Sequence, residues 1–261
     1  MRAQSMVLLI LLLAAGCLDV APPPPVVTPS RPNVNRADQY ISSWTSMGMW
    51  MPDGQQIQFF RSDFAQSKDK LQGALAAKDA DVRQRAAYVI QKIGKDARTC
   101  GPELLERLKV EPVRLVRIYI IDALAAVRYD VPDAITELAR RFESLSDENI
   151  PRSPVDYEYA DVDEKINIAA ALYVLNKDAN KERYLQFVTQ WLKAPASNLS
   201  HEELRGYGER RWVAVISLEG MPGATSAVPL LEAMLEEKSA EPWVAIHVPR
   251  VLKALRQGDG P

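Results

Sequence analysis

The chain has 261 residues, of which 47% are hydrophobic, and it carries 32 basic and 34 acidic residues for a formal net charge of −2. This near-neutral balance, without a basic stripe, argues against a nucleic-acid partner. Its two cysteines, Cys17 and Cys100, do not supply the framework of a disulfide-stapled domain. Composition and size therefore indicate a folded domain with a sizeable hydrophobic core.

The N-terminal segment 1–16 is interpreted as a signal peptide. Arg2 precedes an apolar run from Met6 to Ala15, which is too short for an ordinary transmembrane helix. The segment Leu13-Ala14-Ala15-Gly16-Cys17 resembles a bacterial lipoprotein signal. The resemblance implies that Cys17 is acylated and anchors the protein to a membrane of the bacterial cell envelope, inner or outer. The alternative is an ordinary secretory leader that is cut near Gly16.

Residues 17–36 are interpreted as a tether between the lipid and the folded domain. Ala21 to Arg36 reads APPPPVVTPSRPNVNR, with six prolines. Proline-rich composition favours an extended polyproline conformation. Such a spacer holds a folded domain away from the membrane surface.

Two stretches of the chain, 81–93 and 112–124, repeat the same pattern. In the first, Asp81 is expected to cap an apolar helix and Gly94 to close it. A capped apolar helix repeated at a fixed interval predicts a stacked helical array. The matched positions of the first stretch, and their counterparts in the second, are Val82, Arg83, Tyr88, Ile90, Ile93 and Val113, Arg114, Tyr119, Ile121, Leu124.

The helical periodicity extends over residues 68–257. Leu71 and Leu75 give the first helix of one pair its apolar face, and Leu104 and Leu108 do the same in the next pair. Residues 144–161 interrupt the pattern and are interpreted as an inserted loop. The predicted fold is all-α, an α-solenoid of stacked antiparallel helix pairs; an irregular helical bundle is the alternative.

The strongest stretches of this pattern resemble HEAT repeats. They are Asp81-x-Arg83 with the alanine-rich helix that follows, and Ser226 to Leu235. The 31-residue spacing of the two matched stretches is similar to that of the short repeats of bacterial and phycobilisome lyase-like proteins. In that family a turn acid and a following arginine form a ladder between repeats. The resemblance therefore implies this inter-repeat role for Asp81 with Arg83 and for Glu111 with Arg114.

Residues 37–67 precede the array and contain the chain's densest group of aromatic and methionine side chains. We interpret them as a cap over the apolar end of the first repeat. The alternative is a surface that grips a partner, with Trp50 and Phe59 as candidate contacts. The sequence Pro52-Asp53-Gly54 is compatible with a small hairpin in this segment.

The chain offers few groups for catalysis, and no catalytic, cofactor or metal site is predicted. His201-Glu202-Glu203 lacks the second histidine of a zinc-binding helix, and there is no serine-hydrolase elbow or phosphate-binding loop. An acidic run lacks the ligand spacing of a calcium loop and is interpreted as solvated. Its residues are Asp156, Glu158, Asp161, Asp163 and Glu164.

Two arginines are candidate contacts for a partner. Arg117 and Arg128 lie on or just beyond the second long helix, and arginine is enriched among residues that dominate binding energy. The sequence thus favours a membrane-anchored, non-catalytic scaffold whose second helices bind a protein or peptide. The alternatives are a lyase-like enzyme or enzyme accessory, and a purely structural envelope component.

Overall fold

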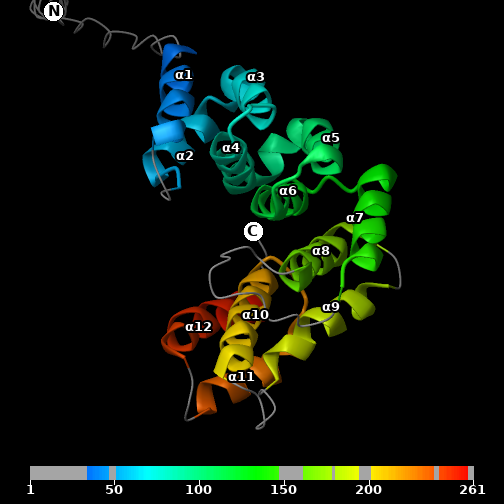
Figure 1. Ribbon diagram of the computed structural model, residues 1–261. Helices are drawn as coiled ribbons and strands as arrows, with labels where there is room; N and C mark the ends of the chain where they lie inside the picture. Colours follow the sequence, from blue (N-terminus) through cyan, green and yellow to red (C-terminus); the bar gives the residue numbers. More distant parts are fainter. Residues whose placement is uncertain are drawn as a thin grey trace, which may run out of the picture. The chain divides into compact units, whose positions relative to one another are not determined.

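The computed structural model describes residues 34–46, 51–146, 161–177, 180–193, 201–237 and 241–257. All regular secondary structure in these residues is helical, which confirms the predicted class (Figure 1). The chain divides into Met1–Asn33 and Val34–Pro261, and only the second unit contains described residues. The predicted signal peptide, Cys17, Trp50 and most of the predicted tether and 144–161 loop lie outside them.

From α3 onward, the described helices follow one another as pairs. Four short 3-10 helices supplement them: η1 (Trp44–Ser46), η2 (Gly94–Cys100), η3 (Gln190–Leu192) and η4 (Thr225–Ala227). The pairs are α3 (Phe64–Leu75) with α4 (Ala80–Ile93), α5 (Gly101–Val110) with α6 (Arg114–Ala126), α7 (Pro132–Ser144) with α8 (Asp161–Leu175), α9 (Lys181–Thr189) with α10 (His201–Glu219), and α11 (Val228–Glu236) with α12 (Pro242–Gln257).

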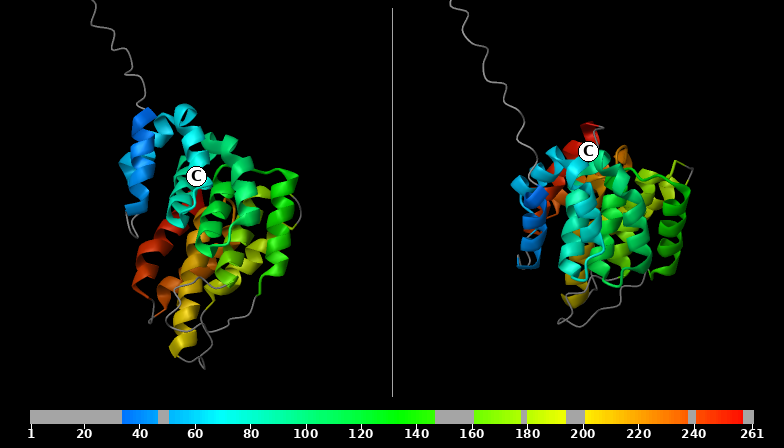
Figure 2. Two further views of the ribbon diagram at one scale, coloured as in Figure 1. Left: turned by 45° about the horizontal axis from the view of Figure 1, so that its top comes forward. Right: turned by 90° about the horizontal axis from the view of Figure 1, so that it is seen from above.

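The second helices of the pairs form a layer of their own. Helix α4 packs on α6, α6 on α8, α8 on α10, and α10 on α12. The first helices pack against this layer from one side, and α9 contacts both α8 and α10 (Figures 1 and 2). Each pair therefore buries its apolar side against its neighbours, which is the solenoid-like arrangement predicted from the repeat.

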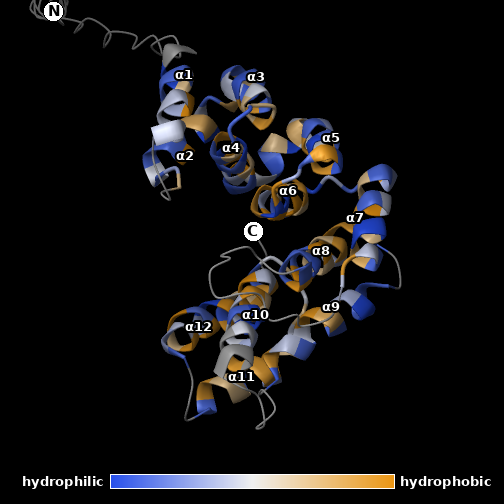
Figure 3. Ribbon diagram, in the orientation of Figure 1, coloured by the Kyte–Doolittle hydropathy of each residue, from blue (hydrophilic) through white to orange (hydrophobic). Residues whose placement is uncertain are grey.

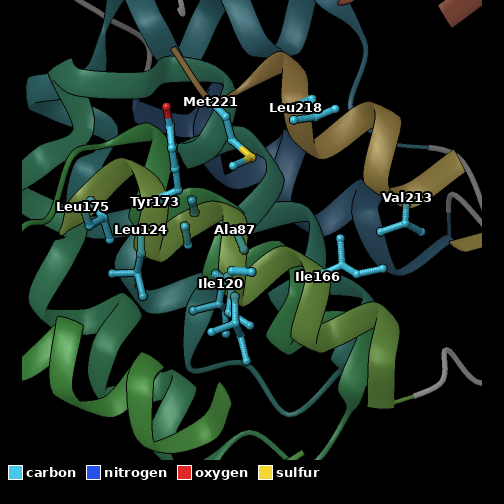
Figure 4. Close-up of a cluster of buried hydrophobic side chains, with 14 of the residues drawn as sticks. Ala87, Ile120, Leu124, Ile166, Tyr173, Leu175, Val213, Leu218 and Met221 are labelled. Carbon is cyan, nitrogen blue, oxygen red and sulfur yellow. The ribbon is translucent and has the colours of Figure 1, made fainter. Parts of the chain in front are cut away.

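The hydrophobic core runs without interruption through the stack. Leu71, Leu75, Leu104 and Leu108 are all buried, as predicted. Much of the hydrophobic colour in Figure 3 lies on α6 and α8, which have neighbours on both sides. Figure 4 shows part of this core, with labelled side chains from α4, α6, α8 and α10 and with Met221, which follows α10. Within the described residues, no helix combines the length and the hydropathy needed to span a membrane.

Two helices precede the first pair and cover it. Helix α1 (Val34–Ser43) packs on α3, and α2 (Gly54–Ser62) packs on α3 and α4. Trp44 and Phe60 are fully buried, with ring centroids 5.8 Å apart, and the Trp44 indole donates a hydrogen bond to Gln56 at 3.1 Å. These side chains bury the apolar end of the array. Helix α1 begins inside the stretch predicted as tether.

The hairpin predicted for this segment is wrong, because Pro52-Asp53-Gly54 leads into a helix. The Asp53 carboxylate accepts a hydrogen bond from the Gln56 backbone N–H at 2.8 Å and is the N-cap of α2. An aspartate in this position satisfies one of the free N–H groups of the first helical turn. The apolar residues that follow then continue as a helix whose buried residue is Phe60.

Equivalent positions of α4 and α6 are 34 residues apart, and not 31 as predicted from the sequence pattern. Gly94 after α4 and Arg128 after α6 both have a positive φ, +76° and +56°. Arg83 donates to the carbonyls five and six residues before it, and Arg117 does the same. Gly94 and Arg128 are 34 residues apart in the sequence, and so are Arg83 and Arg117.

The 31-residue spacing instead identifies side chains that touch across the α4–α6 boundary. The rings of Tyr88 and Tyr119 meet edge to face with centroids 6.0 Å apart, and Gln91 donates to Asp122. The two spacings differ by about one helical turn. Because residues one turn apart share a face, the pattern alone does not distinguish equivalent positions from contacting ones.

The N-cap of α4 is Asp79, and not Asp81 as predicted. The Asp79 carboxylate accepts a hydrogen bond from the Asp81 backbone N–H at 2.8 Å, so Asp79 is the N-cap of α4. Asp81 lies in the first turn, where its carboxylate pairs with Arg85 at 3.3 Å. An acid in the first turn also interacts favourably with the helix dipole.

The two helix ends predict opposite responses to substitution. Replacing Arg128, at φ +56°, by glycine should raise the free energy of unfolding by about 1 kcal/mol, because a left-handed backbone strains any residue with a β-carbon. Gly94→Ala should lower it by at least a similar amount. Chemical denaturation of the mature protein measures both. A less stable Arg128→Gly variant would contradict the assigned backbone conformation.

Candidate functional site

A buried ion pair joins the first helix pair to the second. The Arg83 guanidinium donates two hydrogen bonds to the Glu111 carboxylate, from Nε to Oε2 at 2.7 Å and from Nη2 to Oε1 at 2.8 Å. The side chains are 5% and 0% exposed. Arg83 therefore links two repeats, but it pairs with Glu111 of the next repeat and not with Asp81 as the resemblance implies.

Three residues donate hydrogen bonds to the Glu111 carboxylate. Besides Arg83, Arg107 donates from Nε at 2.7 Å and the Val113 backbone N–H donates at 3.0 Å. Burial by itself would raise the pKa of Glu111, but the hydrogen bonds from Arg83, Arg107 and Val113 outweigh it and lower the pKa to about 2. The carboxylate is thus held ionised at the junction of α5 and α6.

A second linkage of the same kind joins the next two pairs. Arg117 donates from Nε and Nη2 to the two carboxylate oxygens of Glu164, at 2.8 and 2.7 Å. Glu164 is fully buried in the first turn of α8. Arg114 pairs with Asp161 of the same turn, so it does not pair with Glu111 as the resemblance implies. Glu164 is therefore not solvated as predicted, whereas Asp161 pairs with Arg114 but keeps a side chain that is 35% exposed.

A third linkage fastens α10 to the connection before α12. Arg211 donates from Nη1 and Nη2 to the Glu237 carboxylate at 2.8 and 2.6 Å. The Arg211 guanidinium also donates to the Leu192 carbonyl at 3.1 Å. Bidentate pairs of this kind fix an orientation as well as a distance, so each one constrains how successive parts of the array meet.

The candidate partner contacts have different environments. The Arg117 side chain is engaged by Glu164 and by two backbone carbonyls, so its role is structural. Arg128 is partly exposed, and no hydrogen bond or ion pair joins its side chain to another described residue. Phe59 is partly buried and packs edge to face on Tyr40, with centroids 5.3 Å apart. Phe59 thus belongs largely to the packing of α1 against α2.

Partly exposed aromatic side chains lie on the second helices. Tyr88 of α4 meets Tyr119 of α6, and Trp212 of α10 meets the His247 ring of α12 edge to face at 6.5 Å. Trp212 is 38% exposed. With Asp122 of α6 and Asn167 of α8, these residues define what we call the second-helix surface. Its members are Tyr88, Tyr119, Asp122, Asn167, Trp212 and His247, all at least partly exposed.

Asp122 is the chemically unusual member of this surface. The Gln91 amide donates to its Oδ2 at 3.5 Å, the outer limit for a hydrogen bond. Removal of water by the surrounding protein raises the pKa of Asp122 to about 7, and the positive charge of Lys92 opposes the rise only in part. Near neutral pH this carboxyl is therefore present in both protonation states.

The described residues contain no group of three side chains suited to hold a metal ion. Cys100 is fully buried, and burial raises the pKa of its thiol to about 12, which leaves little thiolate. No family model, curated protein or solved structure matches the chain. The resemblance to HEAT repeats therefore stays a prediction from the sequence pattern.

Sequence reasoning missed Glu164 and Asp122. Glu164 lies 47 residues beyond its partner Arg117, across the inserted segment, and the sequence holds no signal that pairs them. Asp122 had a visible signal, because it is the one charged residue in the apolar run Ile118 to Ala126. A charged side chain within such a run has either a partner or a perturbed pKa.

Removal of the Glu111 charge should destabilise the array. Glu111→Gln is expected to lower the free energy of unfolding at pH 7 by about 3 kcal/mol, because it leaves Arg83 buried without its counter-charge. The ordinary pKa is 4.5 and the folded-state pKa is about 2. The stability that the charge contributes is therefore present above pH 4.5 and is lost as the pH falls toward 2.

Urea denaturation at several pH values measures the difference between wild type and variant. The matched control is Glu106→Gln on α5, where a carboxylate that is 71% exposed pairs with Lys109, and it should cost less than about 1 kcal/mol. An equal effect of the two substitutions would show that burial of the Arg83–Glu111 pair does not matter.

Proposed function

We propose that this protein is a membrane-anchored, non-catalytic scaffold or adaptor of the bacterial cell envelope that binds a protein or peptide through its second-helix surface. The observation that carries the proposal is the pairing of partly exposed aromatic rings between neighbouring second helices. Aromatic side chains supply large contact areas at low entropic cost and are enriched in protein interfaces.

The way in which the repeats are fastened supports a binding role. The linkages of Arg83 with Glu111 and of Arg117 with Glu164 hold α4, α6 and α8 in fixed relation. A surface that is already ordered loses less conformational entropy when it binds. Stacked helical repeats commonly provide extended surfaces of this type. We therefore propose that the array serves as a binding surface, as HEAT repeats do.

The anchor is the second part of the proposal. The lipoprotein-like segment that ends at Cys17 and the proline-rich stretch behind it are the features that support it. Two acyl chains give stable membrane attachment where a single chain gives only marginal binding. A semi-stiff spacer then leaves the second-helix surface accessible to a partner in the envelope.

The binding proposal predicts that recovery of the partner depends on side chains of the second helices and not on those of the first helices. A partner recovered from solubilised envelopes with the wild-type protein should be reduced about tenfold or more with Trp212→Ala or Tyr88→Ala, since aromatic hot spots typically contribute about 2 kcal/mol. Quantitative mass spectrometry of the recovered material measures this, and thermal melting checks that each variant is folded.

The matched controls lie on the first helices, where Val110 and Leu235 are 68% and 43% exposed. Val110→Ala and Leu235→Ala should retain the partner. Retention by both aromatic variants, or equal loss with the two controls, would rule out the second-helix surface as the binding site.

The anchor predicts a modified N-terminus. Mass spectrometry of the membrane fraction should identify a mature N-terminal peptide that begins at Cys17 and carries acyl chains. Replacing residues 1–17 by an ordinary secretory leader should move the protein to the soluble fraction, because the lipid supplies the membrane affinity. A mature chain that starts elsewhere, or that stays membrane-bound without Cys17, would refute the lipid anchor.

A further inference from the structure

The Asp122 carboxyl of the second-helix surface accepts few hydrogen bonds for a group that the protein shields from water. Asp122 accepts one long hydrogen bond, from Gln91 at 3.5 Å, although an ionised carboxylate has about four acceptor positions. No other described residue donates to it. The protein around it removes enough water to raise the pKa to about 7, yet the residue remains partly exposed. Within the described residues, the Gln91 amide is the one donor to this carboxyl.

Two tyrosines share helix faces with the residues of this hydrogen bond, Tyr88 with Gln91 on α4 and Tyr119 with Asp122 on α6. Tyr119 precedes Asp122 by three residues and so lies on the same side of α6. Its ring meets the Tyr88 ring of α4 edge to face, with centroids 6.0 Å apart, and both tyrosines are partly exposed. The arrangement combines a carboxyl with the faces of electron-rich rings, which attract cations.

The protein itself already places a cation at this position. The Lys92 ammonium lies 5.1 Å from the centre of the Tyr88 ring, and its charge lowers the pKa of Asp122 in part. Lys92 is an exposed residue one helical turn beyond Tyr88, and no described carboxylate forms an ion pair with it. A stronger cation can displace it into solvent at little cost.

We infer that Tyr88, Tyr119 and Asp122 form a recognition site for a basic side chain, lysine or arginine, of the partner. The inference rests on the proposed function and specifies the chemistry of the partner at this point of the surface. Charge complementarity supports it, because a cation supplies the hydrogen bonds that Asp122 lacks and the charge that balances its ionised form. Arg117, the candidate contact on the same helix, is already engaged by Glu164.

Proton linkage gives the inference a direct readout. A cation binds the ionised carboxyl more strongly than the neutral one, so its binding lowers the pKa of Asp122. Among the charged side chains of the described elements packed against α6, only Lys92 acts on this pKa, and it lowers it. Burial raises the pKa of the Tyr88 phenol above its ordinary value, so this ring adds no charge near pH 7.

The experiment follows the Asp122 carboxyl carbon by NMR in the isotope-labelled mature protein between about pH 4 and pH 9. Blocked tripeptides with a central lysine or arginine serve as probes, and a tripeptide with norleucine is the uncharged control. At saturation the basic probes should lower the titration midpoint by about one pH unit, the result of tenfold tighter binding to the ionised form. Norleucine should leave it in place.

Two variants test the position of the site. Asp122→Asn should abolish the response of the Tyr88 and Tyr119 ring signals to the basic probes. Asp96→Asn, which removes an exposed carboxylate of η2, should retain it. The wild-type titration decides the question by itself if the Asp122 variant does not fold.

An unchanged midpoint with both basic probes, or an equal shift with norleucine, would overturn the inference. Retained ring responses in Asp122→Asn would also overturn it. A partner that is lost with Trp212→Ala while the wild-type titration is unmoved would leave the proposed function intact and remove only this inference. A midpoint shift with the basic probes, but no partner bound at the second-helix surface, would support cation binding at Asp122 and refute the proposed function.

Discussion

The structure depends on arginines that pair with buried glutamates of the following repeat. Arg83 with Glu111 and Arg117 with Glu164 form such links, with the carboxylates fully shielded from solvent. A guanidinium and a carboxylate that leave water must satisfy each other, and the loss of one partner leaves a buried charge. Hydrophobic stacking alone tolerates sliding between helices, whereas a bidentate ion pair permits one register. These links therefore determine which residues of adjacent helices meet.

The register has direct consequences for the surface. Because α4 and α6 are held with Arg83 and Arg117 in equivalent positions, Tyr88 contacts Tyr119 and Gln91 reaches Asp122. A shift of one helical turn would separate both pairs of side chains. The desolvation of Asp122 has the same origin, since it arises from the protein that the register brings around α6. The stability of the array and its proposed binding chemistry thus have a common physical cause.

The two ends of the array differ in how far their apolar side chains are covered. At the start, α1 and α2 bury Trp44 and Phe60 over the first pair, so the aromatic residues there contribute to packing. At the other end, the last helix keeps Ile246 68% exposed. Exposed side chains of the second helices, and not the aromatic cap, are therefore the better basis for a binding role.

The sequence by itself determined the helical class, the pairing of helices and the buried leucines, because a 3.6-residue apolar period is a local property. It also identified Arg83 and Glu111 as inter-repeat residues. It did not determine the 34-residue repeat, since residues one turn apart give similar patterns. The helix at Gly54 in place of a hairpin, and the burial of Glu164 by an arginine 47 residues away, were decided by the tertiary structure. Capping geometry and long-range charge pairing depend on which segments meet in space, and a linear pattern does not contain that information.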